Sequence, residues 1–222
     1  MKKVLCVPDM HLPWVDAKKL AQIYTAIERE KPDVVIQLGD LYDFYSHSKF
    51  PRNTDLMTSK EEICEARQGA EAFWKNVRKS SKRIRCIQIL GNHDARPSKR
   101  VSERYPEIAH LVGIDDLFRF ASVESILDTR AEFKIDGVIY THGHFTQHGR
   151  HAAYYGQSVV HGHSHRPAVI YQRLHGRLIW ELDCGHLADE NCEPLQYSAT
   201  KTTKWATGYG IVDKLGPRFV SV

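Results

Sequence analysis

The sequence lacks any apolar run close to the ~20 residues that a membrane-spanning helix needs, so we expect no membrane partner. Its first residues, MKKVLCVPDMH, reach Asp9 and His11 after only a few apolar positions. A secretory signal carries an apolar stretch of about 7–15 residues, so none is expected here. The five cysteines are scattered and odd in number, which favours reduced, mostly buried thiols over a disulfide framework. These absences together predict a cytoplasmic protein.

Strong charge and strong compositional bias are also missing. The formal net charge is +4, which is too small to indicate a partner by itself. Hydrophobic residues make up 42% of the chain and charged residues 26%, as in ordinary globular proteins. The 222 residues contain no repeat, low-complexity segment or linker. We therefore expect a single domain that spans residues 1–222 and encloses a sizeable core.

The first 95 residues alternate between strand and helix patterns. Continuous apolar runs predict buried strands at 3–7, 33–38 and 84–90. Asp16 is expected to cap the helix between the first two strands, and Ser59 with Glu62 forms a predicted capping box for the next helix. This alternation is typical of right-handed βαβ units and a mostly parallel sheet.

The second part of the chain, from about residue 133, is richer in strands. Strands are predicted at 135–141, 157–161, 168–173, 177–183 and 208–213. Gly176 lies between two of these runs and marks a hairpin turn. The complete pattern predicts an α/β fold with two sheets and helices outside them.

Polar side chains follow five of the predicted strands directly. Histidine is abundant, with seven of the 13 between His142 and His165. The strand ends read DMH (Asp9, His11), GDLYD (Asp40, Asp43), GNHD (Asn92, His93, Asp94), THGH (His142) and GHSH (His163, His165). In open α/β sheets, the loops at the carboxyl ends of strands converge on one crevice. Any one of these residues alone is better explained as a turn or core residue. The complete set indicates a compensating cation, because clustered buried carboxylates and imidazoles need one.

The composition of these motifs favours one class of metal chemistry. Oxygen and imidazole ligands without thiolates suit divalent manganese, iron, zinc or cobalt. Two such ions about 3.5–4 Å apart need a short anionic bridge, which a carboxylate provides well. Because phosphoryl transfer depends mainly on positioning and charge neutralisation, this type of site suits phosphate esters.

In this order, the five motifs resemble those of the calcineurin-like metallophosphoesterase family, over residues 9–165. The resemblance implies a four-layer α/β/β/α sandwich with two mixed β-sheets. No cap domain is expected, because no such insertion separates the motifs.

The resemblance also implies a role for each motif residue. Asp9, His11 and His165 would hold a first metal, Asp40 would bridge, and Asn92, His142 and His163 would complete a second. His93 would contact the phosphate and act as general acid, and Asp43 would orient it. Two divalent ions per chain are implied, with manganese first and iron, zinc, cobalt or nickel as alternatives.

Basic residues near the motifs are candidates for substrate binding, namely Arg96, Arg100 and Arg166. Basic and aromatic side chains that alternate on loops can hold a phosphate backbone and stack bases. For the residues after GNHD, a solvated helix face with no binding role is an equal alternative.

The sequence therefore favours a dinuclear metal-dependent phosphoesterase acting on phosphodiesters of a nucleic acid or nucleotide, with a metal-bridging hydroxide as nucleophile. The alternatives are a phosphomonoesterase and a non-catalytic, protein-binding member of the fold. A protein phosphatase is disfavoured, because Phe44 stands where such relatives carry arginine after GDxxD. His186 is not expected to reach the site. The physiological substrate, the oligomeric state and the role of residues 186–207 stay open.

Overall fold

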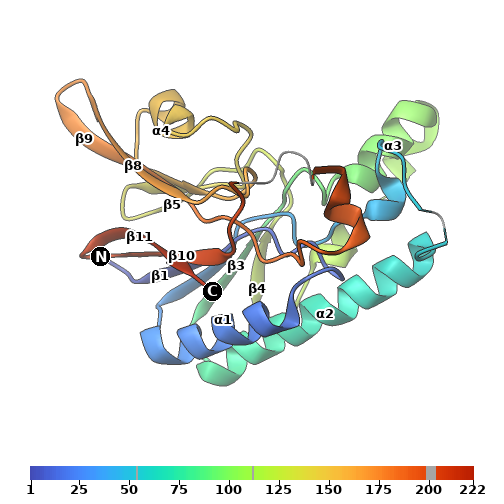
Figure 1. The fold of residues 1–222 in the computed structure, drawn as a ribbon, viewed down its shortest axis with the longest axis horizontal. Helices are drawn as coiled ribbons and strands as arrows, with labels where there is room; N and C mark the ends of the chain where they lie inside the picture. Colours follow the sequence, from blue (N-terminus) through green and yellow to red (C-terminus); the bar gives the residue numbers. More distant parts are fainter. Residues whose placement is uncertain (54, 112, 199–203) are drawn as a thin grey trace.

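The computed structural model describes residues 1–53, 55–111, 113–198 and 204–222. Its strands form two mixed sheets that pack face to face (Figure 1). The six-stranded sheet runs in the order β11 (Gly216–Ser221), β10 (Gly208–Asp213), β1 (Val4–Val7), β2 (Val34–Gln37), β3 (Arg85–Ile89) and β4 (Val123–Ile126). The five-stranded sheet runs β5 (Phe133–Ile135), β6 (Val138–Tyr140), β7 (Val159–His161), β9 (Arg177–Asp183) and β8 (Ala168–Leu174).

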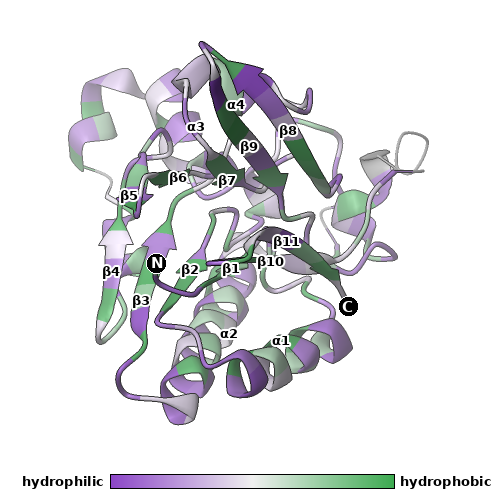
Figure 2. Cartoon of the chain, turned by 90° about the vertical axis from the view of Figure 1, so that its left-hand side faces the viewer, coloured by the Kyte–Doolittle hydropathy of each residue, from purple (hydrophilic) through white to green (hydrophobic). Residues whose placement is uncertain are grey.

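The helices lie on the two outer faces and at one end of the sandwich. They are α1 (Ala17–Glu30), α2 (Ser59–Ser80), α3 (Arg96–Arg104) and α4 (Arg150–Tyr155), with short 3₁₀ turns at Tyr45–His47, Pro106–Leu111, Asp115–Phe118 and Glu193–Ser198. Figure 2 shows α1 and α2 under the six-stranded sheet, the five-stranded sheet above it and α4 outermost. The predicted four-layer α/β/β/α fold is confirmed, with a thin fourth layer because α4 has only six residues.

The apolar core has a separate part in each gap between layers. Between the sheets, Ile36 and Ile89 belong to the same buried cluster as Val160 and Leu182. The other face of the six-stranded sheet packs on α1 and α2, whose buried positions include Phe73. Because β1, β2 and β3 are covered on both faces, their sequences are mainly apolar, and the glutamines that interrupt β2 and β3 are buried.

The helix starts agree in part with the sequence predictions. The Asp16 carboxylate does cap α1, accepting from the backbone N–H groups of Lys18 and Lys19. The predicted capping box of α2 is wrong by one residue, because Thr58 and Glu61 form it. Glu62 is instead buried, with its carboxylate accepting the backbone N–H of Ser46 at 2.9 Å.

The strand predictions differ from the structure in three places. The run 135–141 is divided between β5 and β6 by a turn at Asp136-Gly137, where both residues have positive φ. Asp-Gly is a favoured pair for such two-residue hairpins. The strands β4 and β11 were not predicted from the sequence. The hairpin at His175-Gly176 between β8 and β9 is confirmed.

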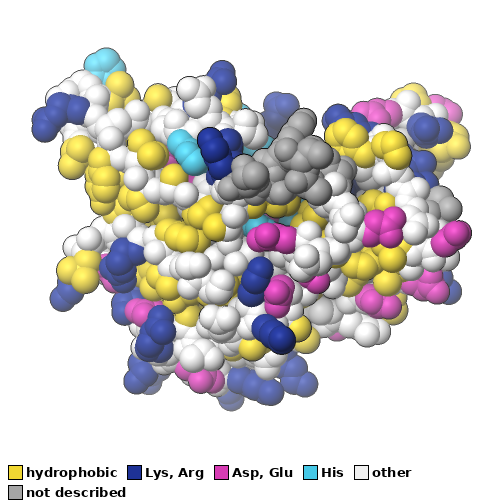
Figure 3. Space-filling model, viewed as in Figure 1, with side chains coloured by type: hydrophobic (Ala, Val, Ile, Leu, Met, Phe, Trp, Pro, Cys, Tyr) yellow, Lys and Arg dark blue, Asp and Glu magenta, His cyan; other side chains and the backbone are white. Residues whose placement is uncertain are grey.

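The surface carries both signs of charge. On the face in Figure 3, lysine and arginine side chains lie among aspartate and glutamate side chains, in keeping with the small net charge. In the described part of the chain, no helix is long and apolar enough to cross a bilayer.

Candidate metal centre and active site

The carboxyl ends of β1, β2 and β3 meet those of β6 and β7 at one edge of the sandwich. Backbone contacts hold these ends together, since the N–H groups of Met10 and His11 both lie 3.0 Å from the carbonyl oxygen of Asp40. Side chains link the same loops: the His163 N–H donates to Asp9 Oδ2 at 2.8 Å, and the His93 N–H donates to Asp40 Oδ1 at 2.7 Å. Four of the five predicted motifs are joined directly by these contacts.

The first group of potential metal ligands contains Asp9, His11 and His165. All three side chains are buried. The Nε2 atom of His165 lies 3.1 Å from Asp9 Oδ2 and 3.2 Å from His11 Nε2. Three donor atoms so close together, from both sheets, can surround one cation.

The second group contains Asp40, His142 and His163. His142 Nε2 lies 3.4 Å from Asp40 Oδ2 and 3.3 Å from His163 Nδ1. The amide oxygen of Asn92 completes the group, at 2.9 Å from His142 Nε2 and 2.8 Å from His163 Nδ1. The Nδ1 atom of His142 lies 3.1 Å from the carbonyl oxygen of Leu38. Because a carbonyl only accepts, Nδ1 donates there, and Nε2 is left with a lone pair for a metal.

The electrostatics of these groups favour a bound cation. Within the described residues, Asp9 and Asp40 form ion pairs with histidines and with no lysine or arginine. Asp9 Oδ1 is buried without a hydrogen-bond partner there. Burial lowers the pKa of an imidazole, but the charge and hydrogen bond of Asp40 outweigh burial and raise the pKa of His142 to about 9. The site thus attracts positive charge, and its donors fit a divalent metal ion.

The backbone around the donors is arranged for close approach. A Cβ at Gly39 would lie 2.7 Å from His142 Nδ1, and a Cβ at Gly162 would overlap Oδ1 of Asp9. Among the non-glycine residues with positive φ are four donors, His11, Asp40, His163 and His165. The left-handed backbone conformation is costly for residues other than glycine. Residues in this conformation are often found at functional sites, where the surrounding structure enforces it.

His93 lies beside the donors, and Asp43 holds it. Asp43 Oδ1 lies 2.8 Å from His93 Nδ1 and 2.9 Å from His11 Nδ1. The Arg96 guanidinium contacts His93 Nε2 at 2.9 Å and the Asp43 carbonyl oxygen at 2.8 Å. A guanidinium only donates, so Nε2 of His93 accepts and its Nδ1 carries the proton toward Asp43. Burial is the largest influence on His93 and lowers its pKa, against the raising effect of Asp40 and Asp43.

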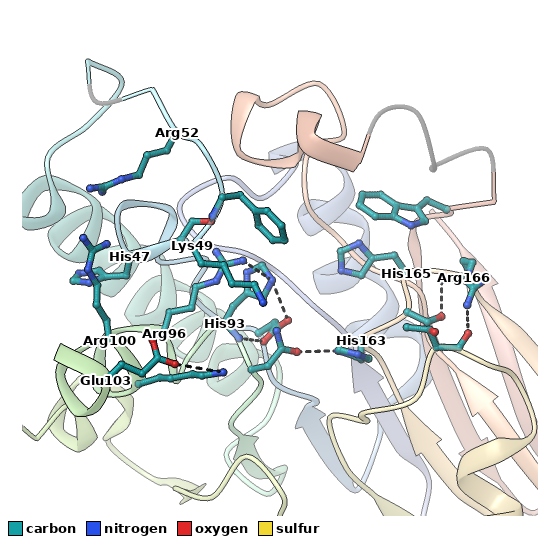
Figure 4. A pocket seen from close by; sticks show the side chains of 18 of the residues that line it. His47, Lys49, Arg52, His93, Arg96, Arg100, Glu103, His163, His165 and Arg166 are labelled. Atoms are coloured by element: carbon teal, nitrogen blue, oxygen red, sulfur yellow. Dashed lines mark hydrogen bonds and ion pairs between the residues drawn. The ribbon is translucent and has the colours of Figure 1, made fainter. Parts of the chain in front are cut away.

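A cavity of ≈ 1000 Å³ opens from His93, Asn92 and His163 (Figure 4). Arg96, Arg100 and Arg166 all line this cavity. Arg96 contacts His93, the general-acid candidate, and Arg100 lies farther along the same wall. Arg166 lies on the opposite wall, where it donates to the carbonyl oxygen of Thr146. The structure therefore places the three predicted substrate-binding arginines around one cavity. In the described part of the chain, the side chains of Arg100 and Arg166 do not contact the donor groups.

The prediction that His186 stays away from the site is wrong. Its buried ring stacks on His165, with centroids 4.7 Å apart and planes at 23°. Trp205 packs edge-on against both rings. The pKa of His186 falls to about 2, because burial and then the neighbouring His165 and His11 disfavour its charged form. No sequence motif marks this residue, since it follows a strand late in the chain and meets His165 only in the folded protein.

Asp94, the last residue of GNHD, connects the loops after β2 and β3 through its carboxylate. Its carboxylate accepts the backbone N–H groups of Tyr42 at 2.9 Å and Gly91 at 2.8 Å. Burial, and then the charge of Asp40, raises its pKa to about 8. Asp94 therefore joins the loops after β2 and β3 and does not face the donor groups.

The chain matches the model of one protein family and is similar to two phage proteins. A family model described as calcineurin-like phosphoesterase matches residues 2–168. The chain is 28% identical to the Gene 54 protein of Mycobacterium phage D29, over 95% of this chain and 88% of that protein. It is 26% identical to the Gene 54 protein of Mycobacterium phage L5, over the same shares.

Solved structures with a similar fold include a phosphoesterase and a dimetal phosphatase. Yfce, a phosphoesterase from E. coli, aligns with a TM-score of 0.46 at 14% identity, over 96% of this chain and 88% of that one. A dimetal phosphatase from Danio rerio aligns with a TM-score of 0.43 at 10% identity, over 95% and 91%.

Proposed function

This chain belongs to the calcineurin-like phosphoesterase family, and we propose that it hydrolyses phosphodiesters with two divalent cations. The observation that carries the proposal is the place of Asp40 between two donor sets. The Asp40 carboxylate lies close to His142 and His163 of the second donor group and also to His11 of the first. A single short carboxylate in that place can serve both cations.

Each donor group would hold one ion. Asp9, His11 and His165 would hold the first, and Asn92, His142 and His163 the second, with Asp40 shared and manganese the first metal to test. When bound, the two cations would neutralise charge on the phosphoryl oxygens and lower the pKa of a bound water. The chain's own contribution is to present the donors in a buried, fixed arrangement.

His93 supplies the proton for the leaving oxygen in this proposal. Asp43 fixes the ring by accepting from Nδ1, so Nε2 is the atom that faces the cavity and exchanges the proton. Arg96 now donates to that Nε2 atom at 2.9 Å. An entering phosphate offers the guanidinium a stronger, charged acceptor. Arg96 is therefore proposed to move from His93 to the substrate and leave Nε2 free to carry the proton.

The preference for diesters rests on the shape and charge of the cavity. It extends from the donors between a basic wall around Arg100 and a second wall with Arg166 and Trp205. A diester needs room for a group on each side of its phosphorus atom, and this cavity offers room on both sides. A small monoester would leave most of it unused.

A hydrolysis assay tests this function. With Mn²⁺ added, we expect faster turnover of bis-p-nitrophenyl phosphate than of p-nitrophenyl phosphate. His93→Ala should lower turnover by roughly 10²–10⁴-fold, the usual scale for a general acid, and keep its metal in elemental analysis. His110→Ala is a matched control, because His110 is exposed and lies outside the donor groups.

Two results would contradict the proposal in different ways. Faster turnover of the monoester would identify a phosphomonoesterase. Absence of turnover with manganese, iron, zinc, cobalt and nickel alike would favour a non-catalytic, protein-binding role.

A further inference from the structure

We propose that Arg52 and Arg100 form a subsite for a second phosphate, and that the substrate is therefore a single strand of nucleic acid. This inference rests on the proposed function, because it assumes that the scissile phosphate binds beside His93. It adds the substrate class, and it assigns a place to Arg52, which the family motifs do not include.

Two guanidinium groups converge at this subsite from different elements. Arg52 follows the 3₁₀ turn Tyr45–His47, and Arg100 lies in the middle of α3. Both donate to the carbonyl oxygen of Ser46, with Arg100 at 3.5 Å. Figure 4 shows the two side chains on the same wall of the cavity, with His47 beside them. Two cations that share one neutral acceptor have unused donors for an anion.

In the part of the chain that the structure describes, these two arginines have no carboxylate partner, since neither Arg52 nor Arg100 forms an ion pair with an aspartate or glutamate. Glu103 lies in the same cavity wall but pairs with Lys99 at 4.0 Å. Guanidinium groups are well suited to phosphate, because their planar fork matches two oxygens at once. A ligand phosphate would supply the missing negative charge.

The arginines on α3 form a line that begins at the active site. Arg96, Arg100 and Arg104 are spaced four residues apart, so they lie on one side of the helix with a rise of about 6 Å between neighbours. Arg96 contacts His93, and all three line the cavity. Of the residues in α3, only Pro97 is buried, so these side chains do not cover a core. Cations at regular intervals from the reacting phosphate suit a polymer with repeated phosphates.

The cavity also has the size and the aromatic groups that such a strand needs. Its volume of ≈ 1000 Å³ lies at the upper end of the range for small-ligand pockets, about 300–1,000 Å³. Phe50, which is 45% exposed, lines the cavity, and so does Trp205, which packs against His165. Aromatic rings that flank a basic groove are a common platform for unpaired bases.

The test compares an oligonucleotide with a small diester. Substrates are fluorescein-labelled oligodeoxythymidylate and oligouridylate of twelve nucleotides, and bis-p-nitrophenyl phosphate, each with Mn²⁺. We expect Arg52→Ala/Arg100→Ala to lower the ratio of kcat/KM for the oligonucleotide to kcat/KM for the small diester by about 10–100-fold, the scale of one or two charge-assisted hydrogen bonds. The DNA and RNA strands show which sugar the site accepts.

Salt dependence gives a second readout that damage to the fold would not produce. Each neutralised phosphate of a single strand contributes a slope of roughly −0.7 in log affinity against log salt concentration, so the double variant, which loses one phosphate contact, should lose about 0.7 from the slope. Arg83→Ala is the matched control, because Arg83 is exposed just before β3, at the end of the sheet remote from the donors.

Equal losses on the oligonucleotide and the small diester, or an unchanged ratio and slope, would overturn the subsite. If the wild-type protein hydrolyses neither the small diester nor the oligonucleotides, the proposed function fails instead. In that case, fluorescence anisotropy of the labelled strands with Mn²⁺ still tests the subsite by binding. Tight binding of wild type that the double variant loses would support it, and equal binding by both proteins would contradict it.

Discussion

One oxygen atom of the Asp43 carboxylate contacts two histidines that have different proposed roles. Its Oδ1 accepts from Nδ1 of both His11 and His93, at 2.9 Å and 2.8 Å. Burial raises the pKa of a carboxyl, but here the charge of His93 and hydrogen bonds from both rings outweigh burial and hold the pKa of Asp43 well below its usual range. An ionised Asp43 therefore fixes both rings with Nε2 directed away from it. One of these rings belongs to the first donor group, and the other is the proposed acid.

Asp43→Ala should consequently weaken both metal binding and turnover. We expect Mn²⁺ affinity to fall about 10–100-fold, the usual effect of removing the partner of a ligating histidine. His93→Ala is the comparison, because it removes the proposed acid and leaves the contact between His11 and Asp43 in place. Isothermal titration with Mn²⁺ and the small-diester assay separate the two effects. Wild-type Mn²⁺ affinity in Asp43→Ala would show that this carboxylate does not support His11.

At the scale of single residues, the sequence indicated which side chains gather but not all of their partners. The motif residues could be predicted because each directly follows a buried strand. The second contact of Asp43, the position of Arg96 on His93 and the stacking of His186 on His165 depend on the fold. A buried histidine without hydrogen-bond partners is costly, and a sequence argument therefore places His186 elsewhere.

At the scale of elements, glycine allows the loops after neighbouring strands to approach one another at the donor groups. Gly162 follows β7 and lies against Asp9 after β1, and Gly91 follows β3 and lies against Asp40 after β2. A Cβ at either position would overlap the neighbouring carboxylate. Neither glycine has the positive φ that other residues avoid, so space and not backbone conformation excludes a side chain.

Gly162→Ala should therefore displace Asp9 and reduce the metal content. Overpacking of this kind costs about 1–3 kcal/mol of folding free energy, so the variant should still fold. Gly113→Ala is the matched control, because a Cβ there would meet no atom within 4 Å. Elemental analysis after Mn²⁺ loading and urea unfolding of both variants provide the measurements. A full metal content in Gly162→Ala would mean that Asp9 can shift without loss of the site.

The elements that could be predicted are those whose burial leaves a clear pattern. The strands β1, β2 and β3 are mainly apolar because both faces are covered. In contrast, β4 and β11 are half-buried, and their mixed sequences give no such run. The helix that the sequence offered as an alternative for the residues after GNHD forms as α3, although its start has no capping side chain and only one of its residues is buried.

At the scale of the whole molecule, the fold gathers several carboxylates in one place, where a bound cation would stabilise the folded state. The carboxylates of Asp9, Asp40, Asp43 and Asp94 are all buried at one edge of the sandwich. The pKa of Asp94 rises to about 8 because it is buried near Asp40, which shows that further negative charge is unfavourable there. Folding and metal binding should therefore be coupled, since the cation favours the folded arrangement of these donors.

Asp40→Asn should remove most of the stabilisation that the cation provides. For the wild-type protein, Mn²⁺ at 100 times its Kd should add about 2.7 kcal/mol of stability, and EDTA should remove it. In EDTA, Asp40→Asn should unfold below the wild-type temperature, because it removes the buried charge that pairs with His142, although its amide oxygen can still accept the His93 N–H. Its gain from Mn²⁺ should be small, and calorimetry of both proteins, with His110→Ala as control, measures this difference. A full Mn²⁺-induced increase in Asp40→Asn would exclude Asp40 as a metal ligand. An equal loss of stability with and without Mn²⁺ would assign Asp40 a purely structural role, held by its contacts to the loops after β1 and β3.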